Sequence, residues 1–214
     1  MRVIAVPVKD LSRAKGRLSG ILSPMERGAL TLAMLEDVLS ACVEMPGWQT
    51  WVVSPDPSAL QVAARMRARP LEEEDPGLVS AIRQVEEEAA TADALAVVLA
   101  DLPLLTPAAL MRALQTLGSV VAGPAHSDAG TNLLLRRPPD AIPPRFGNDS
   151  FRKHREAAEL HDIPFAEVRL PQLAFDLDRP ADLADLIASP TRSRAKATCL
   201  EMGLPERLSL RKRA

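Results

Sequence analysis

Tyrosine is absent from the 214-residue sequence, and cysteine occurs only as Cys42 and Cys199, which lie far apart. Such a pair provides neither the disulfide framework of a secreted domain nor a recognisable zinc site. The sequence also lacks an apolar run of the ~18 residues that a membrane-spanning helix requires. Its apolar N-terminal run is too short for a secretory signal. We therefore expect a cytoplasmic protein without a membrane partner.

Charge of one sign is not in excess either, because the formal net charge is -2. A chain so close to neutrality has no overall attraction for nucleic acid, and we expect no nucleic-acid partner. Apolar residues make up 47% of the sequence and charged residues 25%, which is typical of a globular protein.

Apolar runs typical of buried strands alternate along the chain with amphipathic segments typical of helices. This alternation indicates βαβ units, and therefore an α/β fold with a mainly parallel sheet. We predict strands at residues 2–8, 49–56, within 68–78, 94–100, 119–125, 131–137, 165–170 and 174–178. We predict helices from 24 to the Met-Pro-Gly at 45–47, at 57–66 and 78–90, from 107, at 150–160 and at 179–188.

Capping residues mark several of these helix starts. Ser23 and Glu26 form the Ser-x-x-Glu signature of a capping box, and Asp56 and Thr106 each precede a proline. No change in composition divides residues 1–188, which we predict form one domain. Residues 189–214 form a basic C-terminal tail, which we expect to be part helix and part disordered.

The loop after the first strand is basic and contains Lys9, Lys15 and Gly16. It lacks both the Gly-x-Gly-x-x-Gly dinucleotide fingerprint and the P-loop lysine motif. One interpretation is a solvated surface loop, as most charged stretches are. The other is a polyphosphate site, because ligands of open α/β sheets bind beyond the carboxyl ends of the strands.

Asp176 and Asp178 are two residues apart, so both carboxylates would leave the same face if this segment is a strand. Like charges ~4 Å apart repel by about 4 kcal/mol at an effective dielectric near 20. A positive group should therefore lie between them. The alternative for Asp178 is an ordinary N-cap of the helix that follows.

Asp101 follows an apolar run and precedes another, and a buried carboxylate is costly unless it is paired or binds a metal. Together with Asp176 and Asp178 it gives three carboxylates that could converge. Carboxylate oxygens suit Mg²⁺, which one or two carboxylates and substrate phosphates typically hold.

Gly147 and Ser150 bracket the start of a predicted helix, and Thr131 lies where a loop leads into a predicted strand. These residues form a second polar cluster. Backbone N–H groups at a helix start favour anions, whereas ordinary helix capping is the alternative. His154 and His161 show no metal-ligand spacing, and we expect them on or beside a polar helix face.

The motifs "VPVKDLSRAKGRL", "DPGLVSAI", "LADLPLLTP", "GTNLLL", "RFGNDSFRKH" and "FDLDRPADL" occur in an order that resembles the guanylyltransferases of coenzyme F420 biosynthesis. Those enzymes join a phosphorylated three-carbon acid to GMP from GTP. The resemblance extends to about residue 187 and implies a three-layer, Rossmann-like fold, as in nucleotide-diphospho-sugar transferases. It implies that residues 1–188 are a nucleotidyltransferase domain.

The resemblance also implies three sets of site residues. The carboxylates that match the family's metal ligands, and therefore the catalytic site for Mg²⁺, are Asp101, Asp176 and Asp178. The small residues that match its site for the phosphorylated acid are Thr131, Gly147 and Ser150. The residues expected near GTP are Lys9, Lys15, Gly77 and Leu78.

The implied reaction is transfer of GMP from GTP to phosphoenolpyruvate, with 2-phospho-L-lactate and 3-phosphoglycerate as alternative acceptors. A molybdopterin-type nucleotidyltransferase would have a glycine-rich loop where this chain has "KDLSRAKGRL". A non-catalytic nucleotide-binding domain is the alternative from another class, and it would lack one or more of the three aspartates. The expected partners are GTP and the acid, and a homodimer is a possible assembly.

Overall fold

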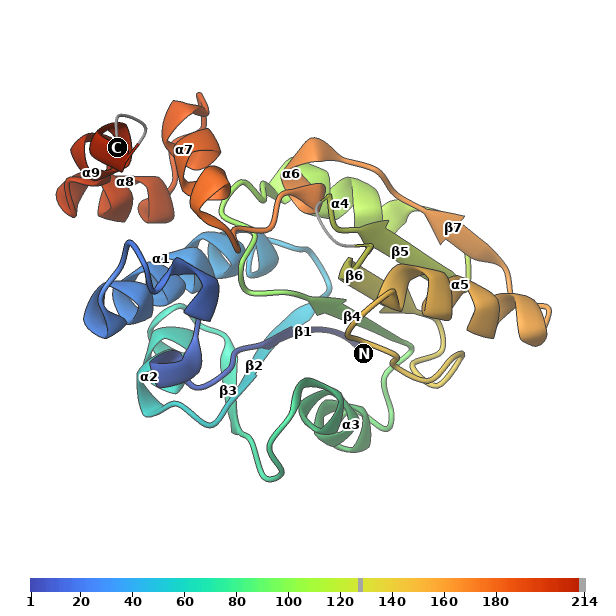
Figure 1. Ribbon diagram of the computed structural model, residues 1–214. Coiled ribbons are helices and arrows are strands. Elements are labelled where there is room, and N and C mark those ends of the chain that lie inside the picture. Colours follow the sequence, from blue (N-terminus) through green and yellow to red (C-terminus); the bar gives the residue numbers. More distant parts are fainter. Residues whose placement is uncertain (127–128, 212–214) are drawn as a thin grey trace.

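The computed structural model describes residues 1–126 and 129–211 (Figure 1). Within these residues, one sheet of seven strands has the order β3-β2-β1-β4-β6-β5-β7. The strands are β1 (Arg2–Pro7), β2 (Gln49–Ser54), β3 (Arg69–Glu72), β4 (Ala94–Val98), β5 (Val120–Pro124), β6 (Thr131–Arg136) and β7 (Phe165–Glu167). Only β6 runs antiparallel to its neighbours in this sheet, which confirms the predicted α/β fold with a mainly parallel sheet.

Three of the helices begin where the predicted capping residues place them. The longer ones are α1 (Pro24–Cys42), α2 (Pro57–Arg65), α3 (Leu78–Glu88), α4 (Pro107–Gln115), α5 (Ser150–Leu160), α7 (Pro180–Ala188), α8 (Arg194–Glu201) and α9 (Leu204–Arg211). The short ones are η1 (Leu11–Arg13), η2 (Gly16–Leu18) and α6 (Pro171–Ala174). Ser23 and Glu26 form the predicted capping box, and the side chains of Asp56 and Thr106 cap α2 and α4.

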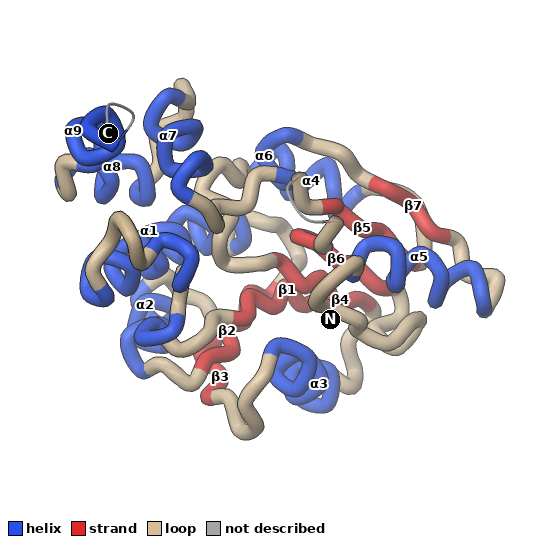
Figure 2. Tube along the Cα trace, in the orientation of Figure 1, coloured by secondary structure: helices blue, strands red, loops and turns tan. Residues whose placement is uncertain are grey.

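Helices cover both faces of the sheet, which gives three layers (Figure 2). Successive strand residues point to opposite faces, so β1 contributes to two cores. Ile4 and Val6 pack on the face that α1, α2 and α4 cover, whereas Val3 and Ala5 pack against α3. On that second face α5 covers β5 and β6. The carboxyl ends of β1, β2 and β4 and the start of β6 therefore meet at one edge.

Helices α8 and α9, which follow residue 188, pack near the outer side of α1 (Figure 1). Leu30 and Met34 of α1 share a buried cluster with Leu183 of α7 and Cys199 of α8. The predicted tail thus contains two helices, and its residues 212–214 lie outside the described part of the chain. The boundary of the nucleotidyltransferase domain at residue 188 stays a prediction.

The predicted strand at residues 174–178 is wrong. Pro171 opens the short helix α6, three residues beyond the end of β7, and the chain then runs to α7 without joining the sheet. Its Leu177 N–H donates instead to the Asp101 carbonyl in the loop after β4, at 3.1 Å. No helix among the described residues has the length and hydropathy to span a bilayer.

Candidate active site

A cavity of about 800 Å³ lies at the carboxyl ends of β1, β2 and β4. The predicted GTP residues that line it are Lys9, Lys15, Gly77 and Leu78. Two of the predicted metal ligands, Asp101 and Asp178, line it as well. The structure therefore brings together six of the ten predicted site residues around one space.

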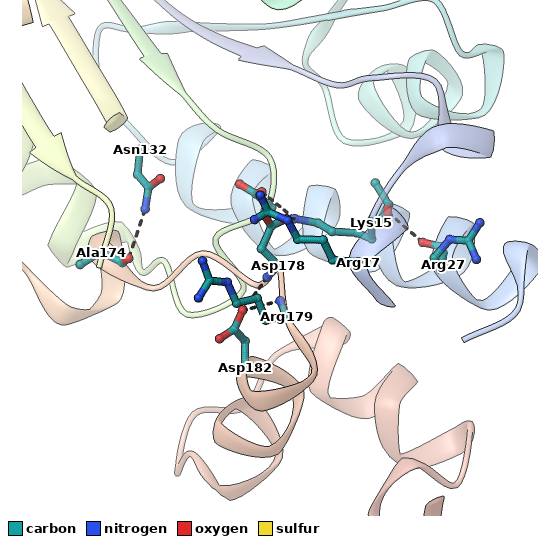
Figure 3. A network of polar contacts seen from close by, with 10 residues as sticks. Lys15, Arg17, Arg27, Asn132, Ala174, Asp178, Arg179 and Asp182 are labelled. Atoms are coloured by element: carbon teal, nitrogen blue, oxygen red, sulfur yellow. Dashed lines mark hydrogen bonds and ion pairs between the residues drawn. The ribbon is translucent and has the colours of Figure 1, made fainter. Parts of the chain in front are cut away.

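Lys15 lies between two of the carboxylates, although 86 and 163 residues separate it from them along the chain (Figure 3). Its Nζ donates to Asp101 Oδ2 at 2.6 Å and to Asp178 Oδ1 at 3.1 Å. Arg17 donates to the other oxygen of Asp178 at 2.8 Å. The sequence predicted a positive group between Asp176 and Asp178, whereas this lysine of the basic loop lies between Asp101 and Asp178. We call Lys15, Arg17, Asp101 and Asp178 the charged cluster.

The backbone at Lys15 supports this placement. Its φ of 51° lies in the left-handed region, which a residue other than glycine enters at a cost of about 1–2 kcal/mol. The side chain is only 8% exposed, whereas that of Arg17 is 61% exposed. A strained backbone at a buried lysine is typical of a functional loop rather than of a solvated one.

The two carboxylates determine the protonation of Lys15. Burial lowers the pKa of the Lys15 ammonium, but the charges of Asp101 and Asp178 outweigh burial and raise the pKa above its usual value. Burial raises the pKa of Asp178, and the charge of Lys15 outweighs it, so the net shift of this pKa is downward. Lys15 and Asp178 are therefore both ionised at neutral pH.

Asp178 is not the N-cap that the sequence left as an alternative. The residue before α7 is Arg179, and the acceptor at this helix start is the Asp182 carboxylate. Asp182 Oδ2 accepts from the backbone N–H groups of Asp178 at 2.7 Å and Arg179 at 2.6 Å (Figure 3). Because Asp182 binds the backbone, the side chain of Asp178 is left to contact Lys15 and Arg17.

Asn132 holds the segment that carries Asp176 and Asp178, a role that the sequence did not predict. Its buried side chain donates to the Leu173 carbonyl at 3.0 Å and to the Ala174 carbonyl at 3.2 Å, and Figure 3 shows the second of these contacts. Its own carbonyl accepts from Leu99, just beyond β4, at 3.0 Å. One residue thus connects β6, the loop after β4 and the end of α6.

The carboxylates of Asp101 and Asp178 together offer oxygens of the kind that suits Mg²⁺. Oδ1 of Asp101 is buried and has no hydrogen-bond partner among the described residues, while Oδ2 contacts Lys15. A buried carboxylate oxygen in this state, with Asp178 close by, suits a cation that substrate phosphates also coordinate. Within residues 1–126 and 129–211, no group of three or more His, Cys, Asp and Glu side chains is arranged to hold a metal. A site shared by all three aspartates stays a prediction.

Thr131 and Ser150 lie outside the cavity lining but contact each other, and their role in binding the acid stays a prediction. Ser150 Oγ donates to Thr131 Oγ1 at 3.1 Å, and both residues are buried. His154 Nδ1 lies 3.1 Å from the same Thr131 oxygen. His154 Nε2 accepts from the Arg145 backbone N–H at 2.9 Å. We call Thr131, Ser150 and His154 the hydroxyl cluster.

The prediction that His154 lies on or beside a polar helix face is wrong, whereas His161 is exposed as expected. The buried residues of α5 are Ser150, Phe151, His154, Ala157 and Ala158. This spacing is the buried stripe of a helix. The helical spacing of these residues in the sequence therefore predicts that His154 is buried, about one turn after Ser150.

Gly147 precedes this helix start and is exposed. Its φ of 113° favours glycine, and its carbonyl accepts from the Ser150 N–H at 3.1 Å. Ser150 is the first residue of α5, and the side chain of Asp149 accepts no capping hydrogen bond from the described helix. Side-chain capping therefore does not explain this cluster.

Comparison with known proteins identifies the family. Residues 1–204 match the family described as guanylyl transferase CofC like. The chain belongs to this guanylyltransferase family. The predicted resemblance is confirmed, and so is the prediction of an enzyme of the nucleotidyltransferase class.

Relatives in this family cover most of the chain. A phosphoenolpyruvate guanylyltransferase of Sphaerobacter thermophilus is 43% identical over 190 residues, which are 86% of this chain and 91% of its own. That of Rubrobacter xylanophilus is 42% identical over 195 residues, 88% of this chain and 95% of its own. A 2-phospho-L-lactate guanylyltransferase of Natronomonas pharaonis is 38% identical over 173 residues, 81% and 79% of the two chains.

Solved structures are similar in fold. A structure from Desulfovibrio desulfuricans G20, described as a nucleotide-diphospho-sugar transferase, superimposes with a TM-score of 0.79 at 17% identity. The match covers 98% of this chain and 97% of that one. A nucleotidyl transferase of Methanothermobacter has a TM-score of 0.65 at 17% identity and covers 87% and 95% of the two chains. The predicted fold is thereby confirmed.

Proposed function

We propose that this chain transfers the guanylyl group of GTP to phosphoenolpyruvate and releases diphosphate, as a step of coenzyme F420 biosynthesis. The observation that carries the proposal is the charged cluster, which lines the cavity at the carboxyl ends of β1 and β4. Two relatives that are 43% and 42% identical bear the name of this activity.

The lining of the cavity supports one orientation of GTP. Lys9, Lys15 and Arg17 are cations of the lining, and cations of this kind suit the triphosphate. Gly77 and Leu78, at the start of α3, lie in the part suited to the nucleoside. A volume of about 800 Å³ accommodates a ligand of nucleotide size.

The reaction needs no base from the protein. A phosphate oxygen of the acid attacks the α-phosphorus of GTP, the new P–O bond forms, and the bond from the α-phosphorus to the β-bridging oxygen breaks. Diphosphate leaves with that bond's electron pair. A phosphate monoester with a second pKa near ~6 is mostly dianionic at neutral pH, so no proton has to move. Catalysis then consists of positioning and charge neutralisation.

Within the charged cluster, Asp101 and Asp178 are the carboxylates that would hold Mg²⁺. The ion, when bound, supplies neutralisation of phosphate charge. Lys15 is the protein's own cation at the same position, and it would pair with the leaving diphosphate.

For the acid we propose the start of α5. Thr131 and Ser150 supply hydroxyl groups there, and the dipole of α5 favours an anion at its N-terminus. Gly147 supplies a turn whose φ favours glycine.

The test is pyrophosphate release from GTP and Mg²⁺ by the purified protein, with one three-carbon acid at a time. We expect phosphoenolpyruvate to give the highest kcat/KM. 2-Phospho-L-lactate is the second candidate, because the Natronomonas pharaonis relative bears that name. 3-Phosphoglycerate, ATP in place of GTP, and omission of the acid are the controls. Pyrophosphate release that no acid increases would refute the proposal.

A further inference from the structure

His154 is a buried titratable residue that the proposed reaction does not use. Its side chain is 0% exposed, and both ring nitrogens have partners. The Phe146 ring packs edge-on against it with 5.1 Å between the ring centroids. These contacts fix the ring orientation.

The partners of the ring also fix its tautomer. The Arg145 backbone N–H can only donate, so Nε2, at 2.9 Å from it, carries no proton. The proton of the neutral ring is therefore on Nδ1, and this N–H donates to Thr131 Oγ1 at 3.1 Å. Burial first, and then the charges of Arg136 and Arg145, lower the pKa of His154 to about 3. The ring stays neutral at physiological pH.

This tautomer leaves one hydroxyl hydrogen over in the hydroxyl cluster. The three donors are the Nδ1–H and the hydroxyls of Thr131 and Ser150, whereas the cluster contains only two internal contacts. If the Ser150 hydroxyl donates to Thr131, the hydroxyl hydrogen of Thr131 has no acceptor within the cluster. If Thr131 donates to Ser150 instead, the hydroxyl hydrogen of Ser150 has none. The other tautomer would use both hydroxyl hydrogens inside the cluster. The Arg145 N–H thus makes the hydroxyl pair a net donor.

We propose that His154 is a positioning residue that orients the Thr131 and Ser150 hydroxyls to donate a hydrogen bond to the anionic acid. The inference rests on the proposed function, because it deepens the site for the acid. An ionised carboxylate or phosphate accepts hydrogen bonds but cannot donate them. A hydroxyl pair with one unused hydrogen is therefore suited to bind it.

The tautomer can be measured on the unmodified protein. Nitrogen-15 NMR of histidine-labelled protein should show His154 with a protonated Nδ1 and an unprotonated Nε2, unchanged across the physiological pH range. A protonated Nε2, or a ring that titrates near neutral pH, would overturn the proposal.

A pair of variants isolates the Nδ1 donor. His154→Asn keeps an N–H where Nδ1 stands, and His154→Leu has none, while both lose the acceptor for Arg145. We expect His154→Leu to have a KM for phosphoenolpyruvate about fivefold above that of His154→Asn, because it loses the neutral hydrogen bond that holds the Thr131 hydroxyl in its donating orientation. The KM for GTP should stay the same in both variants.

His161→Leu is the matched control, because His161 is exposed at the end of the same helix. It should have wild-type constants. Equal KM values for the acid in the two His154 variants, with only lower melting temperatures, would show a merely structural role and overturn the inference. Wild-type protein that releases no pyrophosphate with any acid would instead refute the proposed function.

Discussion

The charged cluster and the hydroxyl cluster lie at the same edge of the sheet but are built in opposite ways. The charged cluster joins full charges from three distant segments, and its outer member Arg17 is 61% exposed. The hydroxyl cluster is neutral and buried, and two of its three members come from the first two turns of α5.

This difference separates two ways of recognising anions. Removal of one member of a buried ion pair leaves an uncompensated charge, which costs about 3–5 kcal/mol. Loss of one neutral hydrogen bond costs about 1 kcal/mol. Substitutions in the charged cluster should therefore affect turnover strongly, and those in the hydroxyl cluster should tune the affinity for the acid.

The largest effect is expected for Asp101→Asn. It removes a charge that pairs with buried Lys15 and the buried oxygen that suits a cation. We expect kcat to fall by at least about a hundredfold, as for the loss of a main electrostatic group, while circular dichroism stays unchanged.

Asp93→Asn is the matched control for Asp101→Asn. Asp93 precedes β4 and pairs with the N-terminal amine, whereas Asp101 follows the same strand at its other end. The control should keep wild-type turnover. Near-normal turnover in Asp101→Asn would remove this carboxylate from the reaction.

The next effect concerns the two cations that pair with Asp178. Lys15→Met should raise the KM for GTP by about tenfold or more, because it loses a buried charged contact. Arg17→Met should raise it less, because solvent screens a side chain that is 61% exposed. Steady-state kinetics with GTP varied at saturating acid measure both. An equal effect of the two variants would contradict the role of burial.

A smaller effect is expected on stability below neutral pH. The pKa of His154 is about 3 in the folded protein, against 6.5 as its ordinary value. Between these values the unfolded chain binds a proton that the folded chain does not. His154 therefore destabilises the fold as pH falls through 6.5, by about 1.4 kcal/mol per pH unit.

Urea unfolding of wild-type protein and His154→Asn at about pH 7 and about pH 5 measures this dependence. The stability of the wild type should fall more steeply than that of the variant. Parallel curves would mean that the buried imidazole accepts a proton as readily as an exposed one.

The smallest effect is expected for Ser150→Ala. The Thr131 hydroxyl remains and keeps its contact with His154, so the KM for the acid should rise only about fivefold, as for one neutral hydrogen bond. The melting temperature should change little, because the Ser150 hydroxyl contacts Thr131 and does not cap α5. A lower melting temperature with an unchanged KM would favour a structural role alone.

Local sequence signals predicted most of the fold. The capping box at Ser23 and the caps at Asp56 and Thr106 locate their helices, because they act within a single turn. The segment 174–178 has the composition of a strand, but its Leu177 N–H donates to the loop after β4 and not to a neighbouring strand. A pattern of residue types does not contain that partner.

The candidate site was predictable in part for the same reason. The rule that ligands bind beyond the carboxyl ends of strands brought Lys15 and Asp101 to one edge, but their direct contact joins loops 86 residues apart. His154 was predictable from the period of α5, whereas its tautomer depends on the Arg145 backbone. Asn132 had no sequence signal, since its partners are carbonyls of a remote helix.

The most direct test follows the phosphorus atoms of GTP. Wild-type protein is incubated with phosphoenolpyruvate and Mg²⁺ together with GTP labelled at either the α- or the γ-phosphate. Guanylyl transfer predicts that the α-label moves into a conjugate of the acid and that the γ-label appears in diphosphate. Asp93→Asn should behave in the same way, and Asp101→Asn should leave both labels in GTP. A γ-label that moves to the acid, or an α-label that never leaves GTP in the wild type, would contradict guanylyl transfer at the charged cluster.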